Sequence, residues 1–466
     1  MIPTAQLSLN ESLVALDRAH LVHPVANWRG HEQRGATVLQ SGRGAWLRDA
    51  EGRELLDAFA GLWCVNIGYG HESVVEAAAR QMRKLPYATG YFGYASEPAI
   101  ELAAKLVEIA PAGLDHVYLT LGGSEAVDAA VRLIVQYYNS TGRPKKKQFI
   151  SIERGYHGSS STGAGLTALP AFHRGFDLPR PEQHYIASPY PYRNPHGDDA
   201  QAVIASSVAA LRAKVNELGA GNVAAFFCEP IQGSGGVIVP PVGWLKAMRE
   251  ACRELDVLFV TDEVITGFGR TGPMFACEAE GVSPDLMAVA KGLTSGYAPM
   301  GALLISERVY AGIADGTPAG AVVGHGATYC AHPVSAAVAL EVIRLYEEGG
   351  ILANGQRVAR HFEAGLQAMS HHPLVGEARS RGLLGALELV SDKVAKTRFD
   401  AALNLADRVA AAGYRNGLIF RAFGDGILGF APALCYTPAE FEQLFDRLNR
   451  TLDEVLDQPE VRRAVS

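Results

Sequence analysis

Through the middle of the chain, apolar segments of strand length alternate with segments of helical periodicity. The strand-like segments are HVYLTL, QFISIE, VAAFFCEPI, VLFVTDEV, LMAVAKG and GALLIS. Between them, apolar residues recur at the spacing of amphipathic helices. This alternation predicts crossover units and a largely parallel sheet covered by helices over residues 66–335.

The segments before and after this region have other patterns. Residues 1–65 contain an amphipathic opening helix and then GAWLRDAEGRELLDAF, two short alternating runs that predict a hairpin. After the helical pattern HPVSAAVALEVIRLYEEGG, residues 336–466 mix helices with strands such as LLGALELV and GILGFAP. We therefore predict three segments, of which the last is an α+β lobe. The run PKKK at 144–147 predicts a solvated loop.

Composition places the chain among ordinary globular proteins. Its 466 residues are 48% hydrophobic, enough for a large core in two or three lobes. The net charge of −7 comes from interspersed charges, which excludes a basic face for nucleic acid. No apolar run approaches about 18 residues, and MIPTAQLSLNES lacks the charged start and apolar stretch of a signal peptide. We expect a cytoplasmic protein without nucleic-acid or membrane contacts.

The metal-binding residue types have no ligand spacing. Six cysteines are scattered without a CxxC pair, which suits reduced, mostly buried thiols. The adjacent His371 and His372 have no partner at the spacing of a metal site. We therefore expect no metal.

Three ionisable residues follow three apolar strands in succession. VAAFFCEP ends near Glu229, VLFVTD ends on Asp262, and LMAVAK ends on Lys291, at intervals of 33 and 29 residues. In a parallel sheet these ends lie at one edge, where open α/β folds bind ligands. Unpaired buried charges are unfavourable, so three in series indicate a polar site within apolar surroundings. An acid beside a lysine suggests an amine with an adjusted pKa.

The same edge offers a place for a phosphate. HVYLTLGGSEAVDAAVRLIVQYY predicts a strand, a Gly122-Gly123-Ser124 turn and a helix, and the start of a helix favours an anion. An ordinary turn in which Ser124 caps the helix is the alternative. The turn is neither a Walker A loop nor a GxGxxG fingerprint, so nucleotide binding is not favoured.

Together, a lysine, an acid and a phosphate seat describe a pyridoxal-phosphate site. GGSEA, GYHGS, EPIQGSGGVIVPP, TDEVITGFGRTG, AKGLTSGYAPMG and TYCAHPVSAAVALE occur in the order of the class III aminotransferases, which the chain resembles over nearly its whole length. The segments GLWCVNIGYG and RAFGD are similar to the ω-amino acid and amine:pyruvate branch. The resemblance implies fold type I, with a large α/β domain and a smaller α+β domain built from the N- and C-terminal segments.

The resemblance also implies catalytic roles. Lys291 would hold pyridoxal 5′-phosphate covalently and, once free, carry a proton between substrate and cofactor. Asp262 would pair with the pyridine nitrogen and keep it protonated. Tyr156 matches the aromatic residue that stacks on the ring, and Val264 the apolar residue behind it. Glu229 resembles the acid near the phenolic oxygen. Packing or structural hydrogen bonding is the alternative for Tyr156, Val264 and Glu229.

By the same resemblance, Gly123 and Ser124 form the phosphate cup. Thr328 matches a threonine that reaches the phosphate from a partner subunit. Each site would then need two chains, which implies a homodimer or a dimer of dimers with shared active sites.

Substrate-binding residues are also implied. Trp63, Tyr91 and Tyr156 resemble the aromatic walls of the pocket, with Tyr91 contributed by the partner chain; such walls favour an apolar amine tail. Arg421 in LIFRAFGDG matches a mobile arginine that pairs with a substrate carboxylate. Core packing remains the alternative for Trp63 and Tyr91, and a surface position for Arg421.

Three positions depart from the wider family pattern. Val127 stands where several relatives have asparagine. Ser234 and Ile265 replace an acid and a glutamine of the ornithine and γ-aminobutyrate branches. The acid can hold the gate arginine, so its loss frees Arg421 and argues against those substrates.

We therefore expect a ping-pong aminotransferase that moves nitrogen from an amine or ω-amino acid donor to a 2-oxo acid acceptor, pyruvate being the expected one. An aminomutase or decarboxylating transferase could use the same cofactor residues. A non-catalytic pyridoxal-phosphate regulator would need a DNA-binding module, for which the N-terminal segment has no pattern. A nicotinamide dehydrogenase would need the missing GxGxxG loop.

Overall fold

A seven-stranded sheet with the order β4-β10-β9-β8-β7-β5-β6 forms the centre of the larger lobe. The structure is a computed structural model that describes residues 9–465. The strands are β4 (Leu114–Thr120), β5 (Gln148–Ile152), β6 (Gln183–Ile186), β7 (Val223–Cys228), β8 (Leu258–Asp262), β9 (Leu286–Val289) and β10 (Gly301–Ser306). Strand β10 alone runs in the direction opposite to the other six strands. The largely parallel sheet is confirmed, and β6 was not among the predicted strands.

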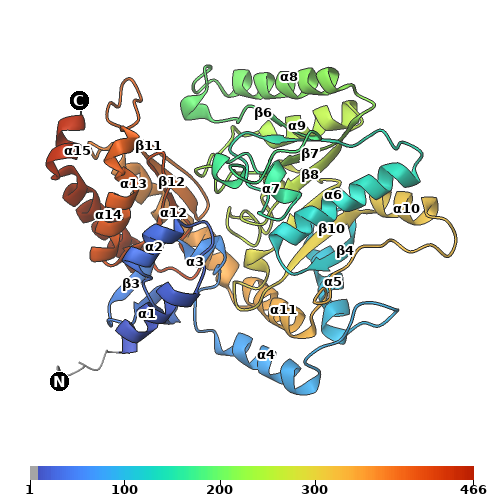
Figure 1. Ribbon diagram of the computed structural model, residues 1–466, viewed down its shortest axis with the longest axis horizontal. Helices are drawn as coiled ribbons and strands as arrows, with labels where there is room; N and C mark the ends of the chain where they lie inside the picture. Colours follow the sequence, from blue (N-terminus) through green and yellow to red (C-terminus); the bar gives the residue numbers. More distant parts are fainter. Residues whose placement is uncertain (1–8, 466) are drawn as a thin grey trace.

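Helices cover both faces of this sheet (Figure 1). They are α4 (Glu72–Lys84), α5 (Glu97–Ile109), α6 (Gly123–Ser140), α8 (Ala200–Leu218), α9 (Trp244–Glu254), α10 (Glu307–Gly316) and α11 (Pro333–Glu347). In β7, Phe226 packs in the core that contains α9, while Phe227 packs in the core that contains α6. Because both faces are buried, the central strands are continuously apolar rather than alternating.

The smaller lobe combines both ends of the chain. One sheet has the order β1 (Leu39–Arg43), β2 (Trp46–Asp49), β3 (Glu54–Asp57), β13 (Leu418–Ile419), and the other β11 (Val375–Arg381), β12 (Leu384–Leu389), β15 (Ile427–Phe430), β14 (Arg421–Ala422). Strands β2 and β3 form the predicted hairpin. Strand β13 pairs with β3, which places Leu418 beside Leu56 and joins the N- and C-terminal segments in one sheet.

The helices of this lobe are α1 (Leu9–His20), α2 (Trp28–Arg34), α12 (Ile351–Met369), α13 (Leu405–Arg415), α14 (Pro438–Leu456) and α15 (Pro459–Ala464). Helix α1 confirms the predicted opening helix, while the first eight residues of MIPTAQLSLNES lie outside the described part. Helix α11 crosses the predicted boundary at residue 335 and contacts α4, α5 and α12. The exact division of the domains stays a prediction. Among the described helices, none is long and apolar enough to cross a membrane.

One expectation about the surface is wrong. The PKKK segment does form a loop, but Lys146 within it is buried rather than solvated. Its ammonium group lies 2.9 Å from the Asp256 carboxylate and 5.3 Å from the centroid of the Tyr138 ring. The carboxylate and the aromatic face compensate the ammonium for lost water.

Arg270 joins the two lobes from the loop between β8 and β9. The side chain is fully buried, and burial lowers its pKa to about 10. One terminal nitrogen donates to the Pro432 carbonyl at 2.6 Å and the Leu383 carbonyl at 3.2 Å. The other donates to Asn66 Oδ1 at 2.6 Å. One guanidinium therefore donates hydrogen bonds to oxygen atoms from three separate parts of the chain.

We predict that Arg270→Met lowers the free energy of unfolding by roughly 3 kcal/mol, because buried oxygen acceptors lose their donor. The measurement is the thermal unfolding midpoint of the protein. Arg253→Met is the control, since Arg253 is exposed and pairs with Glu250 three residues earlier; it should change stability by no more than about 0.5 kcal/mol. Equal unfolding midpoints for the two variants would contradict the proposal that Arg270 holds the two lobes together.

Candidate active site

A cavity of about 490 Å³ lies where β7, β8 and β9 end. Nine of the predicted site residues line it together: Trp63, Gly123, Ser124, Tyr156, Glu229, Asp262, Val264, Lys291 and Arg421. Eight come from the N-terminal segment or the larger lobe, and Arg421 comes from β14 of the smaller lobe. The side chains at the strand ends therefore form one wall of a single cavity. Arg421, from the smaller lobe, contributes to another wall.

Lys291 enters the cavity two residues after the end of β9. Its backbone is in the left-handed region, with φ of 44°. This conformation is strained for a residue other than glycine, and such strain is maintained mainly at functional positions. Burial lowers the pKa of Lys291 to about 8, although the charge of Asp262 opposes this effect. The neutral amine, which is the nucleophilic form, is therefore accessible near physiological pH.

Asp262 is held in place by two hydrogen bonds at the end of β8. Its Oδ2 lies 3.0 Å from His157 Nδ1, and its Oδ1 accepts the Val264 backbone N–H at 3.1 Å. Because a carboxylate only accepts, Nδ1 is the imidazole nitrogen that carries the proton. Within the described residues, His157 Nε2 is buried without a partner. The two donors stabilise the negative charge of Asp262 and fix its orientation toward the cavity.

Glu229 supports the cavity wall from the end of β7. One carboxylate oxygen accepts the Tyr156 backbone N–H at 3.0 Å, and the other accepts the Gly233 N–H at 2.9 Å. Burial raises the pKa of Glu229 to about 7. The Tyr156 ring packs edge to face against Phe172, with centroids 5.3 Å apart. Glu229 thus fixes the backbone that presents the Tyr156 ring to the cavity.

Helix α6 points its N-terminus at the same cavity. It begins at Gly123, and its N-cap residue, Gly122, provides no side-chain cap. Ser124 lies inside the first turn rather than at the N-cap position, and its hydroxyl accepts the Ser159 N–H at 3.3 Å. A Cβ on Gly123 would lie only 2.9 Å from Val264 Cγ1. Glycine therefore permits this close approach, and the free N–H groups of the first turn suit an anion.

The outer wall of the cavity combines aromatic residues with one cation. Trp63, at the end of the short helix α3 (Ala60–Trp63), packs edge to face on Phe59. The Arg421 guanidinium lies 5.3 Å from the centroid of the Phe423 ring. Burial lowers the pKa of Arg421, and within residues 9–465 no carboxylate raises it. Ser234, which stands in place of the acid of other branches, lines this cavity too. Arg421 is thus free to meet a substrate carboxylate.

A second arginine ties the loop after Arg421 to the larger lobe. Arg154, which follows β5, donates to Asp425 Oδ2 at 2.6 Å and to the Gly235 carbonyl at 2.6 and 2.8 Å. It therefore connects the loop after Arg421 with the loop that contains Ser234. The tether holds the β14–β15 loop without using the Arg421 side chain.

Two predicted site residues do not line the cavity. Tyr91 lines a separate cavity of about 430 Å³, beside Gly326. The Thr328 carbonyl accepts the Tyr87 hydroxyl at 2.9 Å on the same side of the molecule. Their roles were predicted to depend on a partner chain, and they stay predictions.

Several cavity residues were not identified from the sequence. His157 lies within the quoted GYHGS motif, where its position next to Tyr156 was the available signal. Phe423 follows Arg421 within RAFGD. Pro24 and Val25 belong to no motif, yet they line the cavity from the segment between α1 and α2. Only tertiary folding places that segment here.

Comparison with known proteins identifies the family. Residues 29–452 match the family described as aminotransferase class-III. The chain belongs to this family. It is 41% identical over 442 residues to a putrescine–pyruvate aminotransferase of Pseudomonas aeruginosa, covering 94% of this chain and 95% of that protein. It is 36% identical to a diaminobutyrate–2-oxoglutarate transaminase of Halomonas elongata, covering 97% and 98%.

Solved ω-transaminase structures superpose closely on this class III aminotransferase. An ω-transaminase from Pseudomonas jessenii in complex with PMP has a TM-score of 0.94 at 38% identity, covering 96% of this chain and 99% of that chain. An (S)-enantioselective ω-transaminase from Thermomicrobium roseum has a TM-score of 0.93 at 38% identity, covering 97% and 100%. The predicted fold class and the aminotransferase activity are thereby confirmed.

Class III aminotransferases use pyridoxal 5′-phosphate, and the cavity of this aminotransferase suits that group. The uncapped start of α6 suits a phosphate. Asp262 suits a protonated ring nitrogen, and Lys291 suits a carbonyl carbon. A Cβ on Gly158 would lie 2.7 Å from Ser124 Oγ, so glycine permits close packing beside the start of α6.

The lowered pKa of Lys291 predicts how cofactor attachment depends on pH. Attack on the cofactor needs the neutral amine, so the attachment rate of the apoenzyme should rise up to about pH 8, where Lys291 titrates, and then level off. Stopped-flow absorbance would measure this rate. Nα-acetyl-lysine in solution is the control, and its rate should keep rising toward about pH 10. A rate for the protein that still rises above about pH 9.5 would contradict the lowered pKa.

Proposed function

We propose that this protein transfers an amino group from a primary amine or ω-amino acid to pyruvate by a ping-pong mechanism, with pyridoxal 5′-phosphate bound at Lys291. The observation that carries the proposal is the single cavity in which Lys291, the Asp262–His157 pair and the start of α6 face Arg421. The cavity provides the amine of Lys291, the buried carboxylate of Asp262 and an anion-binding helix start. Arg421 adds a cation for a substrate carboxylate.

The bound cofactor would supply an electron sink for negative charge on the amine-bearing carbon of the substrate. Asp262 would keep a proton at the ring nitrogen, and His157 would orient Asp262. Tyr156 and Val264 would hold the ring plane between them. Once displaced by substrate, Lys291 would move a proton at its Nζ, for which a pKa of about 8 is well matched. Gly123 and Ser124 would hold the phosphate.

The two substrates would share the outer part of the cavity. Arg421 would bind the carboxylate of pyruvate through paired donors. The aromatic wall formed by Trp63 and Tyr156 would hold an uncharged tail of the amine, with Arg421 turned away. The similarity to a putrescine–pyruvate aminotransferase supports pyruvate as acceptor and makes putrescine the first donor to compare. β-Alanine, taurine and arylalkylamines complete the donor set to be tested.

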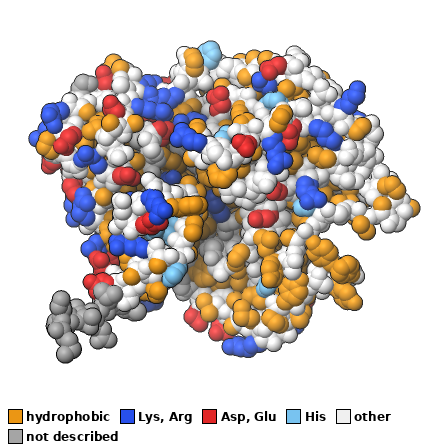
Figure 2. Space-filling model, in the orientation of Figure 1, with side chains coloured by type: hydrophobic (Ala, Val, Ile, Leu, Met, Phe, Trp, Pro, Cys, Tyr) orange, Lys and Arg blue, Asp and Glu red, His pale blue; other side chains and the backbone are white. Residues whose placement is uncertain are grey.

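A homodimer, or a dimer of dimers, is the proposed assembly. Aromatic side chains are exposed near Thr328, among them Phe92 at 90%, Tyr94 at 67% and Tyr329 at 58%. Figure 2 shows apolar side chains gathered at the lower right, over the region where Figure 1 draws α4, α5 and α11. Exposed patches of this kind are typical of interaction surfaces. A second copy there would bring Thr328 and Tyr91 toward the neighbouring cavity.

Absorbance spectroscopy tests the proposed reaction. We expect the visible band of the lysine-bound cofactor to disappear on addition of 1-phenylethylamine and to return with pyruvate, with alanine as product and no carbon dioxide released. Lys291→Ala should show no such cycle, because the proton carrier is lost. A band that neither compound changes would contradict the amine:pyruvate assignment. Carbon dioxide release would favour a decarboxylating transferase, and a rearranged amine product an aminomutase.

Mixing two inactive variants tests the shared site. We expect Lys291→Ala and Thr328→Asp each to be inactive, the second because a carboxylate repels the phosphate. If one chain supplies Thr328 to the other chain's cavity, an equal mixture after subunit exchange should recover about a quarter of wild-type activity, since half the dimers contain one intact site of two. No recovery, despite mixed dimers detected by native mass spectrometry, would contradict sharing.

A further inference from the structure

Helices α1 and α2 and the loop that joins them carry a cluster of two histidines and one aspartate. Asp17 lies on α1, His23 in the loop that follows, and His31 on α2. Pro24 and Val25, directly after His23, line the active-site cavity. The cluster is therefore built into a segment that forms part of the cavity wall. The expectation of no metal was based on the cysteines and on His371 and His372, and it did not extend to these three residues.

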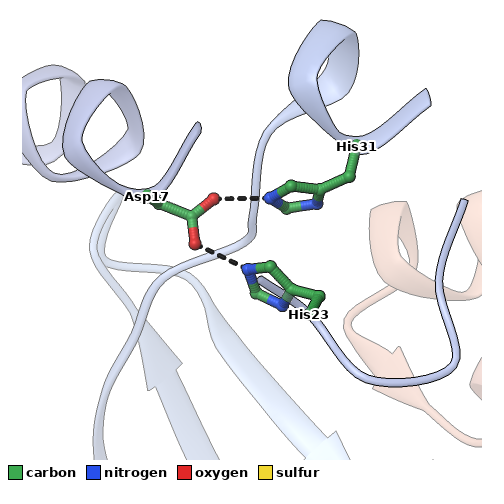
Figure 3. Close-up of side chains that lie close together, drawn as sticks. All are labelled: Asp17, His23 and His31. Carbon is green, nitrogen blue, oxygen red and sulfur yellow. Dashed lines mark hydrogen bonds and ion pairs between the residues drawn. The ribbon is translucent and has the colours of Figure 1, made fainter. Parts of the chain in front are cut away.

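Both imidazoles present the same atom to the same carboxylate (Figure 3). His23 Nε2 lies 2.6 Å from Asp17 Oδ1, and His31 Nε2 lies 2.7 Å from Asp17 Oδ2. The two ring centroids are 4.0 Å apart. One ligand atom from each residue can be chosen so that all three lie within 4.8 Å of one another. Three potential ligand atoms thus converge on one point from three elements.

We propose that Asp17, His23 and His31 bind a divalent zinc ion. Two neutral imidazoles and one carboxylate form a donor set that zinc uses in proteins, with water completing the coordination. Zinc bonds of about 2.0–2.2 Å separate tetrahedral ligand atoms by roughly 3.3–3.6 Å. Binding would require the carboxylate and the two rings to rotate, because the observed Nε2–Oδ contacts of 2.6 and 2.7 Å are shorter than that spacing. The single negative charge of Asp17 favours a cation over an anion.

Hydrogen bonds that do not use the three ligand side chains already hold the segment. Arg18 donates from α1 to the carbonyl groups of Gln33 and Arg34 at the end of α2, at 3.1 and 3.0 Å. Trp28 Nε1 donates to the His23 carbonyl at 3.1 Å. Asn27 caps α2 by accepting the Gly30 N–H at 3.1 Å. The site is therefore preorganised, and an ion need only move side chains.

The cluster is shielded on one side and open on the other. The side chains of Asp17 and His31 are 9% and 12% exposed, whereas that of His23 is 29% exposed. An ion can thus enter beside His23 and be held by the two less exposed ligands. Once bound, it would link α1, the loop and α2, and would restrain Pro24 and Val25 at the cavity wall. The proposed function of the cavity does not depend on this ion.

Zinc titration of the tag-free holoenzyme by calorimetry tests the proposal. At neutral pH, we expect one zinc ion per chain. His31→Gln, His23→Gln and Asp17→Asn should each weaken binding at least about tenfold, because loss of an outer-shell partner alone has that effect. His20→Gln is the matched control, since His20 lies on α1 outside the cluster, and its affinity should match that of the wild type.

Hydrogen exchange of the amides of residues 21–27 gives an independent readout. Zinc should slow exchange in the wild type and in His20→Gln, but not in His31→Gln or His23→Gln. Absence of zinc binding to the wild type, or binding that the cluster variants leave unchanged, would overturn the proposal. Should His31→Gln prove unstable, the more exposed His23→Gln decides the result. The cofactor absorbance band of each variant, recorded beforehand, separates loss of the zinc site from damage to the active site.

Discussion

The structure of the site depends on holding an ammonium group and two carboxylates at the edge of a sheet whose two faces are both buried. Unpaired charges in such a place are strongly unfavourable. The protein meets this constraint with specific donors: His157 and the Val264 N–H for Asp262, and the Tyr156 and Gly233 N–H groups for Glu229. For Lys291, burial outweighs the opposing charge of Asp262, and its pKa is lowered to about 8.

Local backbone geometry then aims these groups at one cavity. Lys291 has a left-handed backbone conformation just after the apolar strand, and it lines the cavity. The absence of a side chain at Gly123 lets the start of α6 come close to Val264 and leaves its first N–H groups facing the cavity. The backbone strain at Lys291 and the close approach of Gly123 to Val264 therefore both occur at the active-site cavity.

The outer half of the cavity exists only because the two lobes are fixed against each other. Arg270 gathers oxygen atoms of Asn66, Leu383 and Pro432 at a buried joint. Arg154 ties the loop after Arg421 to the larger lobe through Asp425. These contacts set the position of Arg421, while its own guanidinium keeps no carboxylate partner among the described residues. We propose that an uncharged amine and a carboxylate-bearing acceptor bind in turn, which requires an Arg421 side chain that no carboxylate holds in place.

The sequence by itself determined the parallel sheet, the strand ends that carry Glu229, Asp262 and Lys291, and the glycine turn before α6. These features are local, because periodicity and glycine placement act over a few residues. It also indicated Trp63, Tyr156 and Arg421 through motifs of the resembled family. It did not determine that His157 supports Asp262, that Lys146 is buried, or that Pro24 and Val25 line the cavity. Nor did it bring Asp17, His23 and His31 together, since their spacing repeats no known pattern. Only the tertiary structure decided these points, because each depends on contacts between segments whose separation along the chain carries no periodic signal.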